Sequence, residues 1–443
     1  MEKINNNIQG LQSNILDLNQ SKSSPIFAPT LDISQAVSNQ FRIALLGTTL
    51  SGKTTLCSIL TDANINTNEI LEKTSSATEF TYISNSNIQI KLLDLCGSES
   101  YLKNTLYGLT SLLPDYSMVV ISGNNGLSQI TKEHIGISLI LKIPLFIVIT
   151  KIDVTPKEIL ENTLEEIYSF ISSPSFSQVN PRILSSDKFV QGSLRSPRPS
   201  LDIIKLSIHK QEDIILLKKY IEELALTSIN NNKAPIIINK QFDKINTVYA
   251  ISNILYLKNK KESDKKDTTT IINGILLKGL IHPGKNMFMG PDTKGDFHPV
   301  QINSIHNDKE SIEKVKENFL CCLSITPLSP SYNDMQRKGM ILVSAENPLP
   351  KSYREFTAEI VVLHQYSTIK LKYFCVIYSQ NIAQSAQVIW LSKPIMKSGD
   401  VGKVKFLFAK YPECINIGDL IILFETRVRG VGHVIEINNN TAN

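Results

Sequence analysis

The sequence predicts an α/β domain built on a phosphate-binding loop, with a mostly parallel sheet and helices on both faces, followed by two all-β units. Residues 47–54, Gly-Thr-Thr-Leu-Ser-Gly-Lys-Thr, match the pattern G-x-x-x-x-G-K-[ST] without a mismatch. From residue 41 to about 228, short apolar runs alternate with helical patterns, which is typical of a parallel sheet. After residue 235 the pattern changes to many short β-type runs separated by turns, which is typical of barrels or sandwiches.

The chain has 443 residues, more than one hydrophobic core usually supports, so we expect several domains. Residues 1–39 are rich in Asn, Ser and Gln, and we expect a disordered arm there without a secretion signal. The α/β domain is predicted at 40–230. A break at Asn347-Pro348-Leu349-Pro350 divides the remainder into units at 231–347 and 348–443.

Six apolar runs predict the strands of the sheet, at 41–46, 80–84, 88–95, 116–122, 144–149 and 202–207. Helical patterns predict helices at 53–62, 99–112, 129–142, 155–172 and 211–226. Residues 173–200 are rich in Ser and Pro, so we expect a surface insertion between the last two of these helices.

The glycine-containing loop that follows the first predicted strand points to a nucleotide triphosphate as ligand. Glycines let the backbone fold around phosphate oxygens, and the N–H groups at the start of the next helix add partial positive charge. In this pattern Lys53 would reach the β- and γ-phosphates, and the Thr54 hydroxyl would bind Mg²⁺. The predicted phosphate-contacting residues are Gly47, Thr48, Thr49, Leu50, Ser51, Gly52, Lys53, Thr54 and Thr55.

A second pattern, D-x-x-G, ends the apolar run at 88–95 as Asp94-Leu95-Cys96-Gly97. Asp94 would hold Mg²⁺ through water, and the Gly97 N–H would contact the γ-phosphate. The pattern is weak alone, because turns use Asp and Gly freely. Its position at the end of a predicted strand is what connects it to the phosphate-binding loop.

A third pattern, Thr150-Lys151-Ile152-Asp153, follows the apolar run at 144–149. The Asp153 carboxylate could accept two hydrogen bonds from guanine N1 and N2, while the stem of Lys151 would lie along the base. Adenine offers no such pair of donors, so this pattern favours GTP and argues against an ATP-using enzyme with the same loop. The three patterns together predict a GTP-binding domain.

Composition excludes several other classes. The six cysteines form no C-x-x-C pair, which argues against a zinc ribbon or a disulfide framework and favours free thiols in a reducing compartment. The most apolar run, 135–149, contains Lys142 and Pro144, so we expect no membrane span. The net charge is +5, and the positive excess lies after residue 235, where it indicates either nucleic-acid contact or an ordinary lysine-rich surface.

At the level of longer motifs the chain resembles the GTP-binding protein 1 family within the elongation factor Tu/1-alpha superfamily of translational GTPases. In the first part the resemblance is carried by Asp94 to Thr105, Tyr107-Gly108-Leu109-Thr110, Leu113-Pro114-Asp115-Tyr116, Thr131-Lys132-Glu133-His134 and Thr150 to Asp153. In the β-rich part it is carried by Lys278-Gly279-Leu280-Ile281, Met289-Gly290-Pro291-Asp292, Ser304-Ile305-His306, Arg337-Lys338-Gly339-Met340, Ala358 to His364 and Arg427 to Gly432.

The resemblance implies a G domain followed by two β-barrels, the arrangement that holds aminoacyl-tRNA in this superfamily. It implies that Thr74, in Lys73-Thr74-Ser75-Ser76, closes on Mg²⁺ and the γ-phosphate, and that Ser207 and Ile208 contact the base. Thr150, where most GTPases carry Asn, is similar to that family's own usage. As partners it implies tRNA and the ribosome or an RNA-surveillance complex. We further expect a cytoplasmic monomer without membrane contact.

Two positions depart from the superfamily. Translational GTPases carry His directly after the D-x-x-G glycine, where it orients the attacking water, and here that position is Ser98. Leu50 stands in the phosphate-binding loop where an Asp is usual. The catalytic candidates are therefore Ser98, Gly97 and Thr74, and two hypotheses follow. One is a GTPase acting with the translation or RNA-surveillance machinery, and the other is a nucleotide-binding regulatory or scaffold protein with little hydrolysis.

Overall fold

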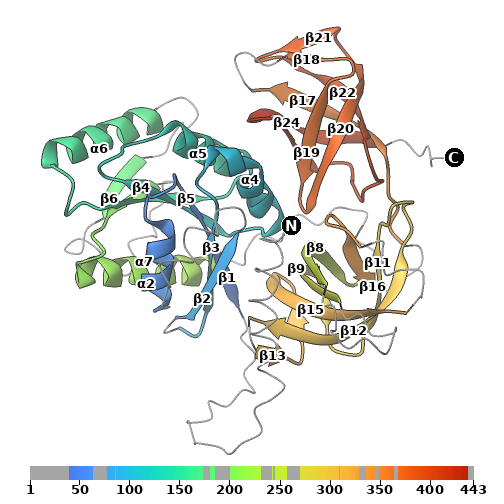
Figure 1. Ribbon diagram of the computed structural model, residues 1–443, viewed down its shortest axis with the longest axis horizontal. Helices are drawn as coiled ribbons and strands as arrows, with labels where there is room; N and C mark the ends of the chain where they lie inside the picture. Colours follow the sequence, from blue (N-terminus) through green and yellow to red (C-terminus); the bar gives the residue numbers. More distant parts are fainter. Residues whose placement is uncertain are drawn as a thin grey trace, which may run out of the picture.

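The structure is a computed structural model that describes residues 39–62, 77–84, 86–172, 180–184, 200–230, 242, 245–256, 270–308, 310–328, 336–344, 349–363 and 368–437 (Figure 1). The predicted N-terminal arm, except Asn39, and the predicted switch residue Thr74 lie outside these ranges. The described part forms an α/β domain, here called the first domain, and two β-barrels, here called the first and second barrels.

The first domain is built on a seven-stranded sheet with the strand order β2-β3-β1-β4-β5-β7-β6. All neighbouring strands run parallel except the antiparallel pair β2–β3. The strands are β1 (Gln40–Leu46), β2 (Thr78–Ile83), β3 (Gln89–Asp94), β4 (Tyr116–Ser122), β5 (Leu145–Thr150), β6 (Asn180–Leu184) and β7 (Ser200–Lys205). The predicted mostly parallel sheet is confirmed.

Helices cover both faces of this sheet, as predicted (Figure 1). On one face lie α2 (Lys53–Thr61) and α7 (Gln211–Asn230), whose apolar side chains share a buried cluster with β1 and β3. On the other face lie α4 (Leu102–Ser111), α5 (Gln129–Ile140) and α6 (Lys157–Ile171). The short 3₁₀ helix η2 (Glu99–Tyr101) leads into α4. The strands read as near-continuous apolar runs because both of their faces are buried.

The predicted surface insertion at 173–200 is wrong in one part, because residues 180–184 form β6 at the edge of the sheet. An edge strand tolerates Pro181, which cannot donate a ladder hydrogen bond. Arg182 on β6 makes two hydrogen bonds to the buried carboxylate of Asp202 on β7, at 2.8 and 2.9 Å. Tyr220 on α7 donates a third to the same carboxylate at 2.9 Å. These partners are distant in sequence, so the local Ser- and Pro-rich composition concealed the strand.

The first barrel is a ring of six strands, β11-β16-β8-β9-β15-β12, that closes through the pairing of β11 with β12, and β13 extends it. Its strands are β8 (Val248–Tyr256), β9 (Thr270–Lys278), β11 (Asn286–Gly290), β12 (His298–Asn307), β13 (Glu310–Ile312), β15 (Phe319–Pro327) and β16 (Ile341–Ser344). A separate two-stranded pair joins β10 (Leu280–Ile281) to β14 (Val315–Lys316).

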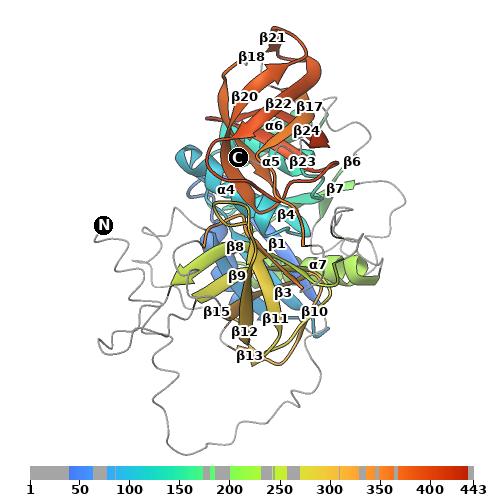
Figure 2. The same cartoon turned by 90° about the vertical axis from the view of Figure 1, so that its right-hand side faces the viewer.

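The second barrel is a closed ring, β17-β22-β20-β19-β23-β24. Its strands are β17 (Glu355–Val362), β19 (Phe374–Ser379), β20 (Ile382–Leu391), β22 (Val401–Phe408), β23 (Leu420–Phe424) and β24 (Val428–Ile437), with the pair β18 (Thr368–Lys370) and β21 (Ile395–Lys397) at one end. Seen from the side opposite the first domain, the two barrels lie one above the other in front of it (Figure 2). The expected second and third units are therefore barrels.

Both barrels contact the first domain. Tyr378, Ile422, Phe424 and Val428 of the second barrel belong to the same buried cluster as α4, α5 and α6. Arg427 adds ion pairs to Glu99 of η2 at 3.1 Å and to Glu133 of α5 at 3.6 Å.

The first barrel meets the β2–β3 edge of the sheet through a charged contact. Lys91 of β3, whose side chain is buried, pairs with Glu79 of β2 at 3.3 Å and with Asp308 of the first barrel at 2.8 Å. Asn273 of β9 donates a further hydrogen bond to Glu79 at 3.1 Å. Two opposite charges thus surround the buried ammonium, as a buried cation requires.

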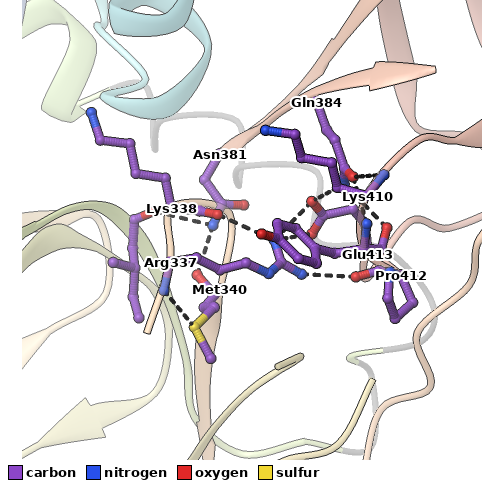
Figure 3. Close-up of polar contacts among 10 residues, drawn as sticks. Arg337, Lys338, Met340, Asn381, Gln384, Lys410, Pro412 and Glu413 are labelled. Atoms are coloured by element: carbon purple, nitrogen blue, oxygen red, sulfur yellow. Dashed lines mark hydrogen bonds and ion pairs between the residues drawn. The ribbon is translucent and has the colours of Figure 1, made fainter. Parts of the chain in front are cut away.

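The two barrels are joined by a buried ion pair between Arg337 and Glu413 (Figure 3). One guanidinium nitrogen, Nη1, donates to both carboxylate oxygens of Glu413, at 2.8 and 2.9 Å, and Nη2 donates to the Pro412 carbonyl at 2.8 Å. Gln384 of β20 donates to the same carboxylate at 2.6 Å. Burial raises the pKa of Glu413 to about 7, and Arg337 and Gln384 oppose that rise.

We expect Arg337→Met to lower the free energy of unfolding by about 3–5 kcal/mol, because it leaves a buried carboxylate without its cation. Adding Glu413→Gln to this variant should restore most of the loss, since the amide is neutral and still accepts from Gln384. Urea unfolding of the two variants and the wild type at pH 7.5 tests this. An equal loss in the single and double variants would contradict it.

Candidate nucleotide-binding site

The residues of the three sequence patterns lie at the carboxyl ends of β1, β3 and β5, where three loops meet at one edge of the sheet. β1 lies between β3 and β4 in the sheet. The strands that follow β1 in the chain are therefore added first on one side of it and then on the other, so the strand order reverses at this point. Ligands of open α/β sheets bind at such a reversal. The three sequence patterns are thus brought together.

The loop between β1 and α2 has a backbone that favours glycine. Gly47 and Gly52 have φ angles of 134° and 96°, and Leu50 adopts a left-handed φ of 65°. The Lys53 ammonium donates to the carbonyls of Gly47 at 3.0 Å and Thr48 at 2.8 Å. Burial lowers the pKa of Lys53, while the carboxylate of Asp94 opposes that change. The charge is therefore held inside the loop, where phosphate oxygens would lie.

Two glycines are required because other parts of the backbone approach them closely. A Cβ at Gly47 would lie 2.1 Å from the Val120 carbonyl oxygen. A Cβ at Gly97 would lie 2.5 Å both from the Gly47 carbonyl oxygen and from Lys53 Nζ. The Thr49 N–H donates to the Gly97 carbonyl at 3.2 Å. The D-x-x-G turn and the phosphate-binding loop therefore touch through backbone, which leaves no space for a side chain.

The predicted Mg²⁺ ligands lie next to each other. The Thr54 hydroxyl donates to Asp94 Oδ2 at 2.5 Å, and Asp94 Oδ1 is buried with no hydrogen-bond partner among the described residues. Burial raises the pKa of Asp94, and Thr54 and Lys53 oppose that rise. A hydroxyl and a carboxylate oxygen without a partner are hard oxygen donors, which suit Mg²⁺. The residues present fit the ion.

The segment after β5 contacts the phosphate-binding loop. Thr150 Oγ1 donates to the Ser51 carbonyl at 2.7 Å, and Lys151 Nζ donates to the Leu50 carbonyl at 2.9 Å. Asp153 is exposed, and its pKa is lowered first by a hydrogen bond with the Ser207 side chain, then by a backbone hydrogen bond at Asp153, with smaller effects from His209 and Lys210. Ser207 and Ile208 lie between β7 and α7, as the sequence placed them. The two segments predicted to contact the base therefore adjoin.

The remaining candidates lie around this centre. Thr55 is exposed in the first turn of α2, and Ile208 and Leu50 present exposed apolar side chains at the rim. Ser98 directly follows Gly97 and precedes η2, and its side chain makes no capping hydrogen bond. Thr48 and Thr49 form the turn of the loop, where Ser51 N–H donates to the Thr48 carbonyl at 3.2 Å.

Sequence reasoning missed His134 of α5 as a site residue. Its Nδ1 accepts a hydrogen bond from the Gly47 N–H at 3.1 Å, and its side chain is buried. Burial, with a smaller effect from Lys53, lowers the pKa of His134 to about 3, so the ring is neutral and carries its proton on Nε2. The Thr131 to His134 motif was the available signal, but nothing in it indicates which loop the ring touches.

A family model for the elongation factor Tu GTP binding domain matches residues 38–280, more than half of the chain. The chain belongs to this family. Among curated proteins, GTP-binding protein 1 of Xenopus laevis is 30% identical over 355 residues, which are 80% of this chain and 51% of that protein. GTP-binding protein 2 of Homo sapiens is 26% identical over 442 residues, covering 90% of this chain and 70% of that protein. The chain thus spans about half the length of the first of these relatives.

Two solved structures share the fold of this chain. Translation elongation factor SelB of Methanococcus maripaludis, in complex with the GTP analogue GppNHp, has a TM-score of 0.65 at 18% identity, covering 90% of this chain and 80% of that one. The GTPase-like domain of S. cerevisiae Ski7 bound to GTP has a TM-score of 0.63 at 14% identity, covering 89% and 97%. These likenesses confirm the predicted order of one α/β domain and two barrels.

Across the part of the chain that the structure describes, no helix combines the length and the apolar character that a membrane crossing needs. The same described ranges contain no cluster of three or more His, Cys, Asp or Glu side chains able to hold a metal by themselves.

We expect stability to fall as the pH drops below 6.5, because His134 stays neutral in the folded protein down to about pH 3 while the unfolded chain takes up the proton at about pH 6.5. This residue should contribute a slope of about 1.4 kcal/mol per pH unit in that window. His134→Asn, which keeps an acceptor for Gly47 N–H and cannot ionise, should remove this part of the slope. Urea unfolding from about pH 6.5 to pH 4 measures it, and equal slopes in both proteins would refute the assignment.

Proposed function

We propose that the protein binds GTP and GDP together with Mg²⁺ at the edge formed by β1, β3 and β5. The observation that carries the proposal is the direct bonding among the three sequence patterns. Thr49 of the phosphate-binding loop is bonded to Gly97, and Ser51 of the same loop is bonded to Thr150. Loops that served only to connect strands to helices would not need to be bonded to one another in this way.

For the phosphates, the proposed contacts are the backbone N–H groups of residues 47–55 and the ammonium of Lys53. Thr54 and Asp94 would hold Mg²⁺, the latter through water, and Thr74 would join them from the switch segment. When bound, the ion neutralises phosphate charge. Gly97 would contact the γ-phosphate through its N–H, since it already lies against the loop at Lys53.

For the base, the proposed selective group is Asp153, whose carboxylate matches the two donors of guanine. Its interaction with Ser207 favours the ionised form, as shown by the direction of its pKa shift. The stem of Lys151 and the exposed side chain of Ile208 would lie against the base. These roles explain why an apolar residue is exposed beside a polar site.

We expect Asp153→Asn to weaken binding of GDP roughly 10- to 100-fold and to strengthen binding of xanthosine diphosphate. The amide can donate to the xanthine carbonyl at C2, whereas the carboxylate needs the guanine donors. Titration of both nucleotides against the wild type and the variant by calorimetry tests this. An unchanged preference for GDP would remove Asp153 from the base site.

We further propose that the bound GTP is hydrolysed slowly by in-line attack of water. Lys53 would stabilise charge on the phosphates, and Gly97 and Thr74 would position them. Ser98 stands where related GTPases use a histidine, and its hydroxyl is too short to orient the same water. The alternative is a GTP-binding regulatory or scaffold protein, and Ser98 together with Leu50 is the observation that favours it.

Single-turnover hydrolysis of bound GTP, with and without ribosomes, separates these two functions. A GTPase should be accelerated by ribosomes, and Ser98→His should raise the rate on the order of 10²-fold if the missing imidazole limits it. Ser98→Ala is the matched control, because it removes the hydroxyl without adding an imidazole. An inert wild type that gains activity only as Ser98→His supports the scaffold function.

As partners we propose tRNA and the ribosome or an RNA-surveillance complex, with a monomeric protein in the cytoplasm. Support comes from the one-domain, two-barrel arrangement shared with SelB, a translation elongation factor. A curated selenocysteine-specific elongation factor of Haemophilus influenzae also matches, at 30% identity over 101 residues. The positive excess after residue 235 agrees with a polyanionic partner.

A further inference from the structure

The hydroxyl of Thr150 is fully committed within the protein. The side chain is buried at the end of β5, and Oγ1 donates to the Ser51 carbonyl at 2.7 Å, with the Ile121 carbonyl farther away at 3.4 Å. A hydroxyl has one proton to donate. The short contact to Ser51 therefore uses the only donor that Thr150 has.

The following residue makes the same kind of contact. Lys151 Nζ donates to the carbonyl of Leu50, which precedes Ser51 in the loop. Leu50 has a left-handed φ of 65°, which is unfavourable for a residue with a Cβ, and its side chain is 77% exposed. Thr150 at the end of β5 and Lys151 just after it thus bind two consecutive carbonyls of the phosphate-binding loop, those of Ser51 and Leu50.

Fixing the Ser51 carbonyl also fixes a donor on the other side of the loop. In a trans peptide the C=O of one residue and the N–H of the next point in opposite directions. With the Ser51 carbonyl turned toward Thr150, the Gly52 N–H points away from β5. Gly52 is the residue that precedes the first turn of α2, where N–H groups bind anions.

We infer that Thr150 is a positioning residue that holds the phosphate-binding loop in its binding conformation and does not read the base. The inference rests on the proposed GTP-binding function. Guanine N7 is an acceptor and needs a donor, which the committed Thr150 hydroxyl does not offer. An amide side chain, as in the Asn of most GTPases, has two protons and can serve both purposes. Base selection in this chain therefore falls to Asp153.

The test compares Thr150→Val, which has the same shape without the hydroxyl, with Thr150→Ser, which keeps it. Dissociation constants are measured for GDP and for 7-deaza-GDP, which lacks the N7 acceptor. Loss of the hydrogen bond from Thr150 to the Ser51 carbonyl should weaken binding of both nucleotides by the same factor, roughly 10-fold, because the loop is then no longer held in place. Thr150→Ser should bind both nucleotides as the wild type does.

Three results would overturn the inference. Thr150→Val could weaken GDP but not 7-deaza-GDP, which would assign the hydroxyl to the base. It could also leave both constants unchanged, which would leave the hydrogen bond without a role in binding. If the wild type bound neither nucleotide, the proposed function would fail as well.

Thermal unfolding confirms that each variant is folded before its affinity is compared. Should Thr150→Val not fold, Thr150→Cys takes its place, because the thiol has a similar size and is only a weak donor. The expected result is again an equal loss for both nucleotides. Asp153→Asn serves as the comparison in which the base contact, and not the loop, is changed.

Discussion

The buried ammonium of Lys53 is the interaction on which the rest of the site depends. Removing a cation from water is costly unless polar groups surround it. Here the carbonyls of Gly47 and Thr48 accept its protons, and Asp94 lies close enough to oppose the lowering of its pKa. Those two carbonyls can face inward only in a loop with unusual backbone angles. Gly97 must then also lack a side chain, because its Cβ would meet the same carbonyl and the ammonium.

The same turn connects the site to both barrels. Directly after Gly97 and Ser98, Glu99 pairs with Arg427 of the second barrel at 3.1 Å. Eight residues further along, Tyr107 of α4 donates to the Ser252 carbonyl of the first barrel at 2.8 Å. Arg337 and Glu413 also join the barrels to each other. In the proposed function, a phosphate contact at Gly97 would act on a segment that contacts both barrels, which is one way to couple nucleotide state to domain arrangement.

The sequence predicted most strands, the order of the domains and the three loops, because each leaves a local signal of periodicity or fixed residue spacing. It did not predict β6, whose Arg182 binds Asp202, 20 residues further along the chain. His134 and Thr150 show the same limit within the site. The residue types were visible, but their partners Gly47 N–H and the Ser51 carbonyl are backbone atoms that any sequence would supply. A hydrogen bond from a side chain to a backbone group distant in the chain therefore cannot be predicted from a single sequence.

The two departures from the superfamily act on different atoms. At position 50 it is the backbone carbonyl that contacts the rest of the site, by accepting a hydrogen bond from Lys151, while the Leu50 side chain is exposed to solvent. Replacing the usual carboxylate by Leu50 therefore leaves the loop's geometry intact. At position 98 the function of the usual histidine resides in its imidazole, which no backbone group can replace. The proposed binding groups, Lys53 and Asp153 among them, are present in this chain, whereas the imidazole proposed to assist hydrolysis is replaced by Ser98, so a sequence can lose the second while it keeps the first.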